Sequence, residues 1–245
     1  MMPSESPSTD WWKPAPGLTW QWQLDEEVDT TIGAEVYDID LYVDQKVIDQ
    51  LHARGIKIIC YISVGSWENW RPDADRFPPE ALGKKYEGWP GEKWLDIRQI
   101  DILAPIIRAR LDLCAAKGFD GVEPDNIDIF NNDTGFPLTY QDQLNYALWL
   151  AEEAHSRGLA IGLKNCPDMV GDVLANFDFA ITEDAYYFSW IEKFVPFIET
   201  GKPVFAAEYT DTGVDFSAAC AYGKRQNVDF ILKNRILTAF RKTCS

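Results

Sequence analysis

Residues 118–128 read Gly-Phe-Asp-Gly-Val-Glu-Pro-Asp-Asn-Ile-Asp, a short strand pattern that runs into a group of carboxylates. Side chains alternate between the two faces of a strand, so Glu123 and Asp125 share one face, while Asp120 and Asn126 lie on the other. Enzymes that perform acid/base or nucleophilic chemistry on sugars usually use two carboxylates that face the same site. The competing interpretation is that these acids are solvated loop residues or helix N-caps.

Strand and helix patterns alternate along the chain on both sides of this stretch. Besides the central stretch, apolar or alternating runs predict strands at residues 19–24, 34–41, 57–64, 159–165, 179–184, 203–209 and 229–232. Amphipathic spacing predicts helices at residues 43–54, 100–117, 140–157, 170–176, 190–199, 216–222 and 236–242. Residues 65–96 form a long excursion rich in Trp, Pro and Gly, and loops of this length inside a domain are usually functional.

About eight strands alternating with helices, in 245 residues, match the size of a (β/α)8 barrel. We therefore predict an α/β protein, a single-domain (β/α)8 TIM barrel over residues 17–245. A doubly wound open sheet is the alternative, but no Gly-x-Gly-x-x-Gly or Walker loop follows any predicted strand. Residues 1–16 are expected to be a disordered leader, or a linker remnant left after removal of a signal or anchor.

The charge balance restricts the partners. The 39 acidic residues against 23 basic ones give a formal net charge of −16, which argues against nucleic acid or an anionic membrane surface. A cationic or neutral ligand fits better, unless the surplus of acid only keeps the protein soluble. No apolar run approaches the roughly 20 residues of a membrane span. We expect a monomer that acts outside the cell or at its surface.

The cysteines and histidines give little support for a metal site, and no cofactor is expected. None of the five cysteines forms a Cys-x-x-Cys pair. Cys220 and Cys244 bracket the last segment and are predicted to form a disulfide, whereas Cys60, in an apolar strand, is predicted to be a buried thiol. His52 and His155 lie near the ends of predicted helices, where interaction with the helix dipole is the favoured interpretation.

Polar side chains gather where the predicted strands end, which is where barrel enzymes place their sites. Asp125 and Glu183 are the strongest catalytic pair, because each ends a strand that faces the same barrel mouth, and Glu208 is the alternative partner. Lys164 can keep a nearby carboxylate ionised, while an apolar pocket raises the pKa of the other carboxyl. Glycoside cleavage needs such a difference in pKa, because one carboxyl group must be ionised and the other protonated.

Several stretches together resemble glycoside hydrolase family 114, the endo-α-1,4-polygalactosaminidase-like barrel proteins. They are residues 20–24 (Trp-Gln-Trp-Gln-Leu), 37–41 (Tyr-Asp-Ile-Asp-Leu), 60–66 (Cys-Tyr-Ile-Ser-Val-Gly-Ser) with Glu68 and Arg71, 94–98, 118–128, 162–165 and 208–209. The resemblance implies an endo-acting hydrolase of galactosamine-containing polysaccharide, with Asp125 as nucleophile and Glu183 as acid/base. The chain departs from many relatives at residues 184–187, Asp-Ala-Tyr-Tyr, where those relatives carry Cys and Phe.

The strand ends and this resemblance together give the expected substrate-binding residues. They are Asp38, Asp40, Tyr61, Ser63, Glu68, Arg71, Glu123, Asn126, Asp128, Lys164, Asn165, Glu208 and Tyr209. A cleft lined by so many acids would attract deacetylated galactosamine, which carries an amine, so the acidic surplus would have a use. Aromatic residues of the loops offer flat faces for sugar rings.

Stereochemistry and two other functions stay open at this point. Strands four and six are separated by one strand, which places their Cα atoms on the order of 10 Å apart, and a Glu leaning inward would leave a gap compatible with a retaining mechanism. A non-catalytic sugar-binding barrel would keep the aromatics and acids, and a reducing-end assay would separate it from an enzyme. A polysaccharide deacetylase usually needs a metal, which two helix-borne histidines do not favour.

Overall fold

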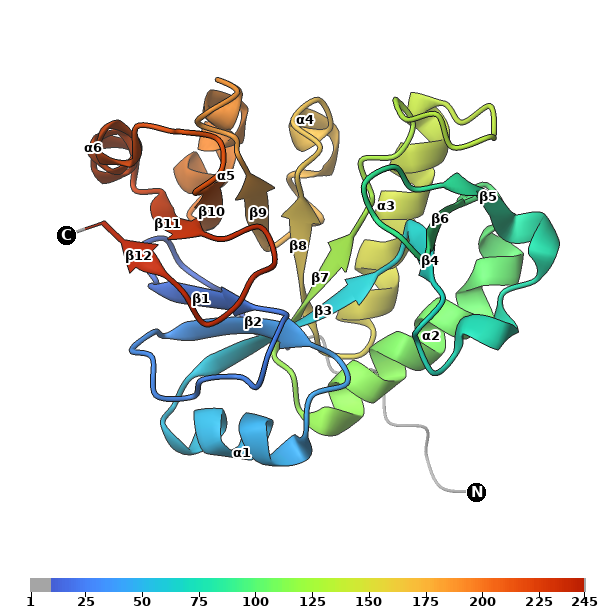
Figure 1. Ribbon diagram of the computed structural model, residues 1–245, viewed down its shortest axis with the longest axis horizontal. Coiled ribbons are helices and arrows are strands. Elements are labelled where there is room, and N and C mark those ends of the chain that lie inside the picture. The colour runs from blue at the N-terminus through green and yellow to red at the C-terminus, as the bar shows by residue number, and fades with distance from the viewer. Residues whose placement is uncertain (1–9, 245) are drawn as a thin grey trace.

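Within residues 10–244, which the computed structural model describes, eight parallel strands follow one another around a curled sheet (Figure 1). They are β1 (Trp20–Gln23), β2 (Val36–Asp40), β3 (Lys57–Ser63), β7 (Gly121–Asp125), β8 (Ala160–Lys164), β9 (Phe179–Glu183), β10 (Val204–Tyr209) and β11 (Asp229–Lys233). Each strand pairs in parallel with the next one in the chain. The predicted (β/α)8 fold is confirmed.

Helices connect the strands on the outside of the sheet. They are α1 (Gln45–Ala53), α2 (Ile100–Lys117), α3 (Tyr140–His155), α4 (Val170–Val173), α5 (Val195–Glu199), preceded by the 3-10 helix η3 (Ile191–Phe194), and α6 (Phe216–Gln226). Thr139 and Asp142 form a capping box at the start of α3, and Gly118, with φ of 90°, ends α2. The end of α2 at Gly118 sets the point at which the chain enters β7, the strand that carries Glu123 and Asp125.

The long excursion folds into a small sheet of its own beside the barrel mouth (Figure 1). Its antiparallel strands β4 (Ser66–Glu68), β6 (Glu92–Leu95) and β5 (Leu82–Lys85) are joined through the 3-10 helices η1 (Ala74–Arg76) and η2 (Pro79–Ala81). A Cβ atom on Gly65 would lie 1.6 Å from the carbonyl oxygen of Asn126, so only glycine permits this approach. The small sheet is therefore seated directly on the loop after β7.

Large aromatic side chains fill the barrel interior. Trp20, Phe179 and Phe205 are fully buried there, and their rings contact one another at centroid distances of 5.3 to 5.9 Å. Gly162 leaves room for the ring of Phe179, because a Cβ at that position would come within 2.3 Å of it. A second apolar layer, rich in Ile and Leu, packs between the strands and the surrounding helices. The interior is thus a packed core below the polar strand ends.

The C-terminal segment differs from the prediction. Residues 236–242 were expected to be a helix, but they cross the barrel end and lead into β12 (Lys242–Thr243), which runs antiparallel to β11. The backbone nitrogen of Leu24 donates to the Leu237 carbonyl, and the Arg241 guanidinium donates to the Trp20 carbonyl. The segment is an irregular turn, with a left-handed φ of 56° at Leu237, rather than a helix. Its bonds to the β1 region close the barrel between the first and last strands.

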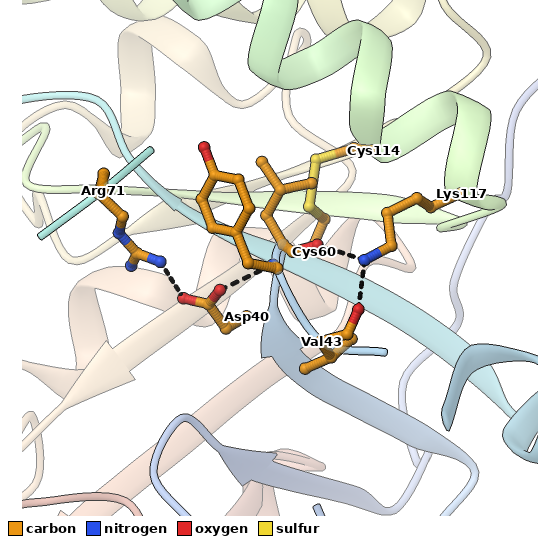
Figure 2. Close-up of a disulfide and its surroundings, with 8 residues drawn as sticks. Asp40, Val43, Cys60, Arg71, Cys114 and Lys117 are labelled. Atoms are coloured by element: carbon orange, nitrogen blue, oxygen red, sulfur yellow. Dashed lines mark hydrogen bonds and ion pairs between the residues drawn. A yellow bond between two sulfur atoms is a disulfide. The ribbon is translucent and has the colours of Figure 1, made fainter. Parts of the chain in front are cut away.

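The cysteine pairing confirms one prediction and overturns another. Cys220 and Cys244 form the predicted disulfide, which fixes the C-terminal segment to α6. Cys60, predicted to be a buried free thiol, instead forms a disulfide with Cys114 of α2 (Figure 2). The sequence separates these two cysteines widely, and only the packing of α2 against β3 brings their Cα atoms to 6.2 Å. The buried free thiol is Cys166.

The chain packs against the barrel before residue 17, the expected start of the domain. Trp11 stacks on His155 at 3.9 Å and donates a hydrogen bond to Asp178, and Trp12 contacts Phe179. Residues 1–9 of the expected leader lie outside the described residues. His155, at the end of α3, also bonds Asp178. None of the helices within residues 10–244 is both long and apolar enough to cross a membrane.

Removing the disulfides should lower the free energy of unfolding in a predictable order. The Cys60–Cys114 bond links residues 54 positions apart and the Cys220–Cys244 bond links residues 24 apart. The longer loop restricts the unfolded chain more, so the paired change Cys60→Ala/Cys114→Ala should cost about 4 kcal/mol and Cys220→Ala/Cys244→Ala about 3 kcal/mol. Urea unfolding of the two variants checks this, and a larger loss from the C-terminal pair would contradict it.

Candidate active site

The carboxyl ends of the barrel strands open into a cavity of about 680 Å³. Most of the predicted site residues line it, namely Asp40, Tyr61, Glu68, Arg71, Asp125, Asn126, Asp128, Lys164, Asn165, Glu183 and Tyr209. Four other predicted residues are buried and do not line the cavity: Asp38, Ser63, Glu123 and Glu208. The cavity therefore brings the proposed catalytic pair together and leaves part of the predicted binding set beneath its surface.

Lys164, at the end of β8, is the centre of the site. Its ammonium nitrogen lies 2.7 Å from Oε1 of Glu123, 2.8 Å from Oδ1 of Asp125 and 3.2 Å from Oε2 of Glu183. The side chain is only 2% exposed. Burial alone would lower the pKa of Lys164, but the surrounding carboxylates, Asp125 first among them, raise it well above its ordinary value. Lys164 is thus a permanent cation that contacts three carboxyl groups from two strands, β7 and β9.

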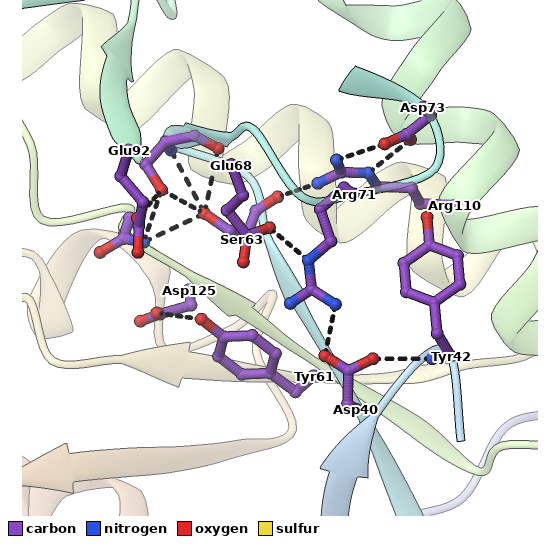
Figure 3. Close-up of polar contacts among 12 residues, drawn as sticks. Asp40, Tyr42, Tyr61, Ser63, Glu68, Arg71, Asp73, Glu92, Arg110 and Asp125 are labelled. Carbon is purple, nitrogen blue, oxygen red and sulfur yellow. Dashed lines mark hydrogen bonds and ion pairs between the residues drawn. The ribbon is translucent and has the colours of Figure 1, made fainter. Parts of the chain in front are cut away.

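Asp125 is fixed by donors on both of its oxygens. Lys164 contacts Oδ1, and the Tyr61 hydroxyl donates to Oδ2 at 2.8 Å (Figure 3). The next residue, Asn126, has a left-handed φ of 63° that turns the chain off the strand. Its amide nitrogen donates to the hydroxyls of Ser63 and Ser66 at 3.0 and 3.2 Å. Ser63 and Asn126 therefore hold the turn that presents Asp125 to the cavity.

Glu183, at the end of β9, is held by neighbours from both adjacent strands. The Tyr209 hydroxyl donates to Oε1 at 2.5 Å, and the Asn165 amide donates to Oε2 at 3.2 Å. The Asn165 side-chain oxygen also accepts from the Glu183 backbone nitrogen at 3.0 Å. The Glu183 side chain is 28% exposed, against 17% for Asp125. Both carboxyl groups are oriented by protein donors and still reach the cavity.

The spacing of the two carboxyl groups bears on the reaction that they can perform. Since Lys164 Nζ lies 2.8 Å from Oδ1 of Asp125 and 3.2 Å from Oε2 of Glu183, these oxygens are at most about 6 Å apart. Retaining glycosidases hold their carboxyl groups roughly 5–5.5 Å apart, and inverting ones roughly 6.5–9.5 Å. The arrangement leaves room for direct attack on a sugar carbon by one group while the other donates a proton.

A carboxyl pair lies beneath the cavity floor. Both oxygens of Asp38 lack an N–H or hydroxyl donor within the described chain. Burial, together with the charge of Glu123 and a hydrogen bond to it, raises the pKa of Asp38 well above its ordinary value. Burial also raises the pKa of Glu123 to about 7, although Lys164 opposes this. The raised pKa favours the neutral form of Asp38 beside Glu123, and Glu123 contacts Lys164. Both acids are buried behind the cavity, so neither is presented to substrate.

Arg71 neutralises two of the other predicted acids (Figure 3). Its guanidinium contacts Oδ2 of Asp40 at 2.5 Å and Oε2 of Glu68 at 2.7 Å. Burial would lower the pKa of Arg71, but the hydrogen bond and charge of Glu68, with Asp40, raise it above the ordinary value. Asp40 and Glu68 thus orient Arg71 at the cavity wall rather than offering free negative charge.

Other acids of the site fall into two kinds. Glu208 is fully buried and accepts hydrogen bonds from the backbone nitrogens of Tyr186 and Tyr187 at 2.8 and 3.1 Å. Asp128, in contrast, lines the cavity, and no ion pair to it occurs among residues 10–244. Burial, then the charge of Asp125, raises the pKa of Asp128 to about 7. Asp128 is the predicted acid best placed to meet a cationic ligand.

Sequence reasoning missed several residues of the cavity. Trp22, Tyr86 and Glu92 line it, as do Trp70 and Trp89, which are 52% and 47% exposed. The aromatic-rich excursion was the signal for most of them. Arg235, Ile236 and Leu237 also line the cavity, but they fall in or beside the segment predicted as a helix. Across the described residues, no group of three His, Cys, Asp or Glu side chains is placed to hold a metal ion.

Comparisons with known proteins identify the family and the fold of this chain. A family model described as glycoside-hydrolase family GH114 matches residues 3–245. The crystal structure of Aspergillus fumigatus Ega3 in complex with galactosamine is 39% identical, with a TM-score of 0.91, and the match covers 97% of this chain and 99% of that chain. The glycoside hydrolase domain of PelA from Pseudomonas aeruginosa, 12% identical, shares the fold with a TM-score of 0.74 over 93% of this chain and 98% of that one. A search of curated protein sequences finds no significant match.

The buried carboxyls predict that the folded state is most stable in mildly acidic solution. Burial raises the pKa of Glu92 from 4.5 to about 7, so the folded chain keeps a proton that the unfolded chain releases in this interval. Stability is therefore lost as pH rises from about 5 to 7, by up to about 3 kcal/mol for one such group. Urea unfolding should show that Glu92→Gln loses less stability than the parent chain over this range.

The matched control for Glu92→Gln is Glu199→Gln, which changes an exposed acid away from the cavity. This control should follow the parent chain at every pH. A Glu92→Gln curve parallel to that of the parent chain would show that Glu92 does not hold a proton in the folded state.

Proposed function

Because the chain belongs to glycoside-hydrolase family GH114, we propose that it is an endo-acting hydrolase that cleaves α-1,4-linked galactosamine inside a cationic, partly deacetylated galactosaminogalactan-type polysaccharide. The similarity to Ega3, whose structure holds galactosamine, supports the choice of sugar. The observation that carries the proposal is the contact of one buried cation, Lys164, with both Asp125 and Glu183. A binding protein would have no need to hold two carboxyl groups at this spacing.

In the proposed reaction, Asp125 attacks the anomeric carbon while Glu183 gives its proton to the departing glycosidic oxygen. A covalent glycosyl ester on Asp125 forms as the bond to the leaving sugar breaks. Glu183 then takes a proton from water, which attacks the same carbon and releases Asp125 with the original anomeric configuration. Tyr61 and Lys164 orient Asp125 for the attack, and Tyr209 and Asn165 orient Glu183.

The cavity walls support recognition of an amino sugar. Asp128 and Glu92 are acids of the wall that no described Lys or Arg neutralises through an ion pair, so they can meet the ammonium groups of a deacetylated chain. Exposed faces of Trp70 and Trp89 at the same cavity suit stacking against sugar rings. Arg71 is compensated by Asp40 and Glu68, so it does not repel a cationic substrate as a free charge would.

We also propose that the protein acts outside the cell, as a monomer. The two disulfides support the location, because such bonds persist in oxidising compartments and are rare in the cytosol. The site supports a monomer, because Asp125, Glu183 and the groups that donate hydrogen bonds to their carboxyl oxygens come from one chain. No residue from a second copy is needed to complete it.

Removing either carboxyl group should abolish hydrolysis without unfolding the barrel. Asp125→Asn and Glu183→Gln should each lower kcat on an α-1,4-galactosamine polymer by roughly 10²–10⁴-fold, because each loses the group that attacks or transfers the proton. Reducing-end release measures activity, and circular dichroism checks the fold. Glu208→Gln is the informative comparison, because Glu208 bonds only the backbone. Full loss in Glu208→Gln with an active Glu183→Gln would transfer the acid/base role to Glu208.

The stereochemistry of the first product provides an independent prediction. Two displacements at the anomeric carbon restore its configuration, so the newly formed reducing ends should be α-anomers. Proton NMR during the first minutes of hydrolysis, before mutarotation, distinguishes the two anomers. Initial β-anomer would exclude Asp125 as a nucleophile and make it a base that activates water.

A further inference from the structure

A second cavity, of about 560 Å³, lies beside the active site between the loops that follow β9 and β10. Tyr186 and Tyr187 line it from the first loop, Asp215 from the second, and Glu192 and Tyr222 from the following helices. None of its lining residues belongs to the active-site cavity. The loops that line the second cavity follow the carboxyl ends of β9 and β10, which is the barrel end that carries the active-site cavity. Strand β8 points toward this end, which is uppermost in Figure 1.

The lining of the second cavity combines aromatic rings with carboxylates, as part of the first cavity does. Tyr187 is 45% exposed and offers an open ring face, and Glu192 and Asp215 are exposed carboxylates. No Lys or Arg is among the lining residues. Aromatic faces stack against sugar rings, and carboxylates without a cationic partner attract ammonium groups. The two acids would repel an anionic ligand, and an uncharged ligand would gain no charge attraction from them.

An unsatisfied hydroxyl at this cavity gives an independent sign of a ligand. Tyr222 lines the cavity and is 7% exposed, and its hydroxyl has no hydrogen-bond partner within the described chain. Buried hydroxyls in folded proteins are nearly always hydrogen-bonded, so an unpaired one at a cavity wall is a position for a ligand donor or acceptor. The hydroxyl or amine of a sugar supplies either.

The second cavity is also held in place by the barrel. Glu208 of β10 accepts hydrogen bonds from the backbone nitrogens of both Tyr186 and Tyr187. The ring of Tyr186 contacts those of Tyr222 and Phe230 at 5.8 and 6.0 Å. Through these two hydrogen bonds, Glu208 fixes the loop that carries Tyr186 and Tyr187 and begins directly after Glu183 and Asp184. Glu208 therefore has a function other than catalysis.

We propose that this cavity is a second binding site for amino-sugar residues of the polymer, outside the site of cleavage. The proposal rests on the proposed function for the identity of the polymer. A chain that occupies both cavities gains affinity because the second contact is intramolecular. A short oligosaccharide that fills only the active-site cavity gains nothing from the second one.

The test compares long and short substrates for the double variant Tyr187→Ala/Glu192→Gln. Its KM for an α-1,4-galactosamine polymer should rise about tenfold, while kcat/KM for a short α-1,4-galactosamine oligosaccharide stays unchanged. Tyr187→Phe keeps the ring and should bind the polymer like the parent chain. Glu199→Gln removes an exposed charge outside the cavity and should also have no effect. An unchanged polymer KM in the double variant, or an equal change for both substrates, would overturn the proposal.

A direct binding measurement separates this proposal from the proposed function. Affinity electrophoresis through a gel that contains the polymer reports binding whether or not the chain is cleaved. Weaker retardation of Tyr187→Ala/Glu192→Gln than of the parent chain supports the second site even if no hydrolysis is found. Equal retardation of the two, or none for the parent chain, would refute the second site and leave hydrolysis to be judged by the reducing-end assay.

Discussion

The contact of Lys164 with Glu123, Asp125 and Glu183 is the interaction on which the site depends. It joins strands β7, β8 and β9 at their carboxyl ends through one ammonium group. An isolated buried charge is very costly, and a buried carboxylate without a partner is costly as well. Each is therefore stable only with the other, and the Trp22 ring, 4.7 Å from the ammonium nitrogen, encloses the group further. Asp125 and Glu183 owe their proximity to this shared cation.

Ion pairs within the protein also decide which carboxylates of this strongly acidic chain can contact a ligand. Asp40 and Glu68 are compensated by Arg71, and Asp184 by Arg235. Burial and the charge of Glu123 raise the pKa of Asp38 beneath the cavity floor, which favours its neutral form. Asp25, Asp128 and Glu92 remain as acids of the wall without an ion pair among the described residues, beside the exposed indole faces of the excursion. The net charge of −16 therefore says little about the cavity until each carboxylate is matched with its neighbours.

Strands β7, β8 and β9 end in the same backbone conformation, which orients their last side chains toward the cavity. Asn126, Asn165 and Asp184 each follow a barrel strand directly and have φ of 63°, 54° and 52°. Asn and Asp tolerate this left-handed conformation better than most residues, and each side chain also bonds a neighbouring strand or loop. The chain thus leaves β7, β8 and β9 sharply, so the last residue of each strand faces the barrel mouth.

The sequence by itself determined the order of the eight barrel strands and of the helices between them, and the strand ends at which Asp125, Lys164 and Glu183 stand, because hydrophobic periodicity and helix caps are local signals. It also identified Cys220 and Cys244 as a pair that brackets one segment. Only the tertiary structure decided the rest, since it depends on contacts between distant residues. Packing of α2 on β3 joined Cys60 to Cys114, and closure of the barrel by Leu237 and Arg241 kept residues 236–242 from forming a helix despite their helical pattern. Depth within the barrel placed Asp38, Glu123 and Glu208 behind the cavity, because strand alternation gives the face of a side chain but not its distance from solvent.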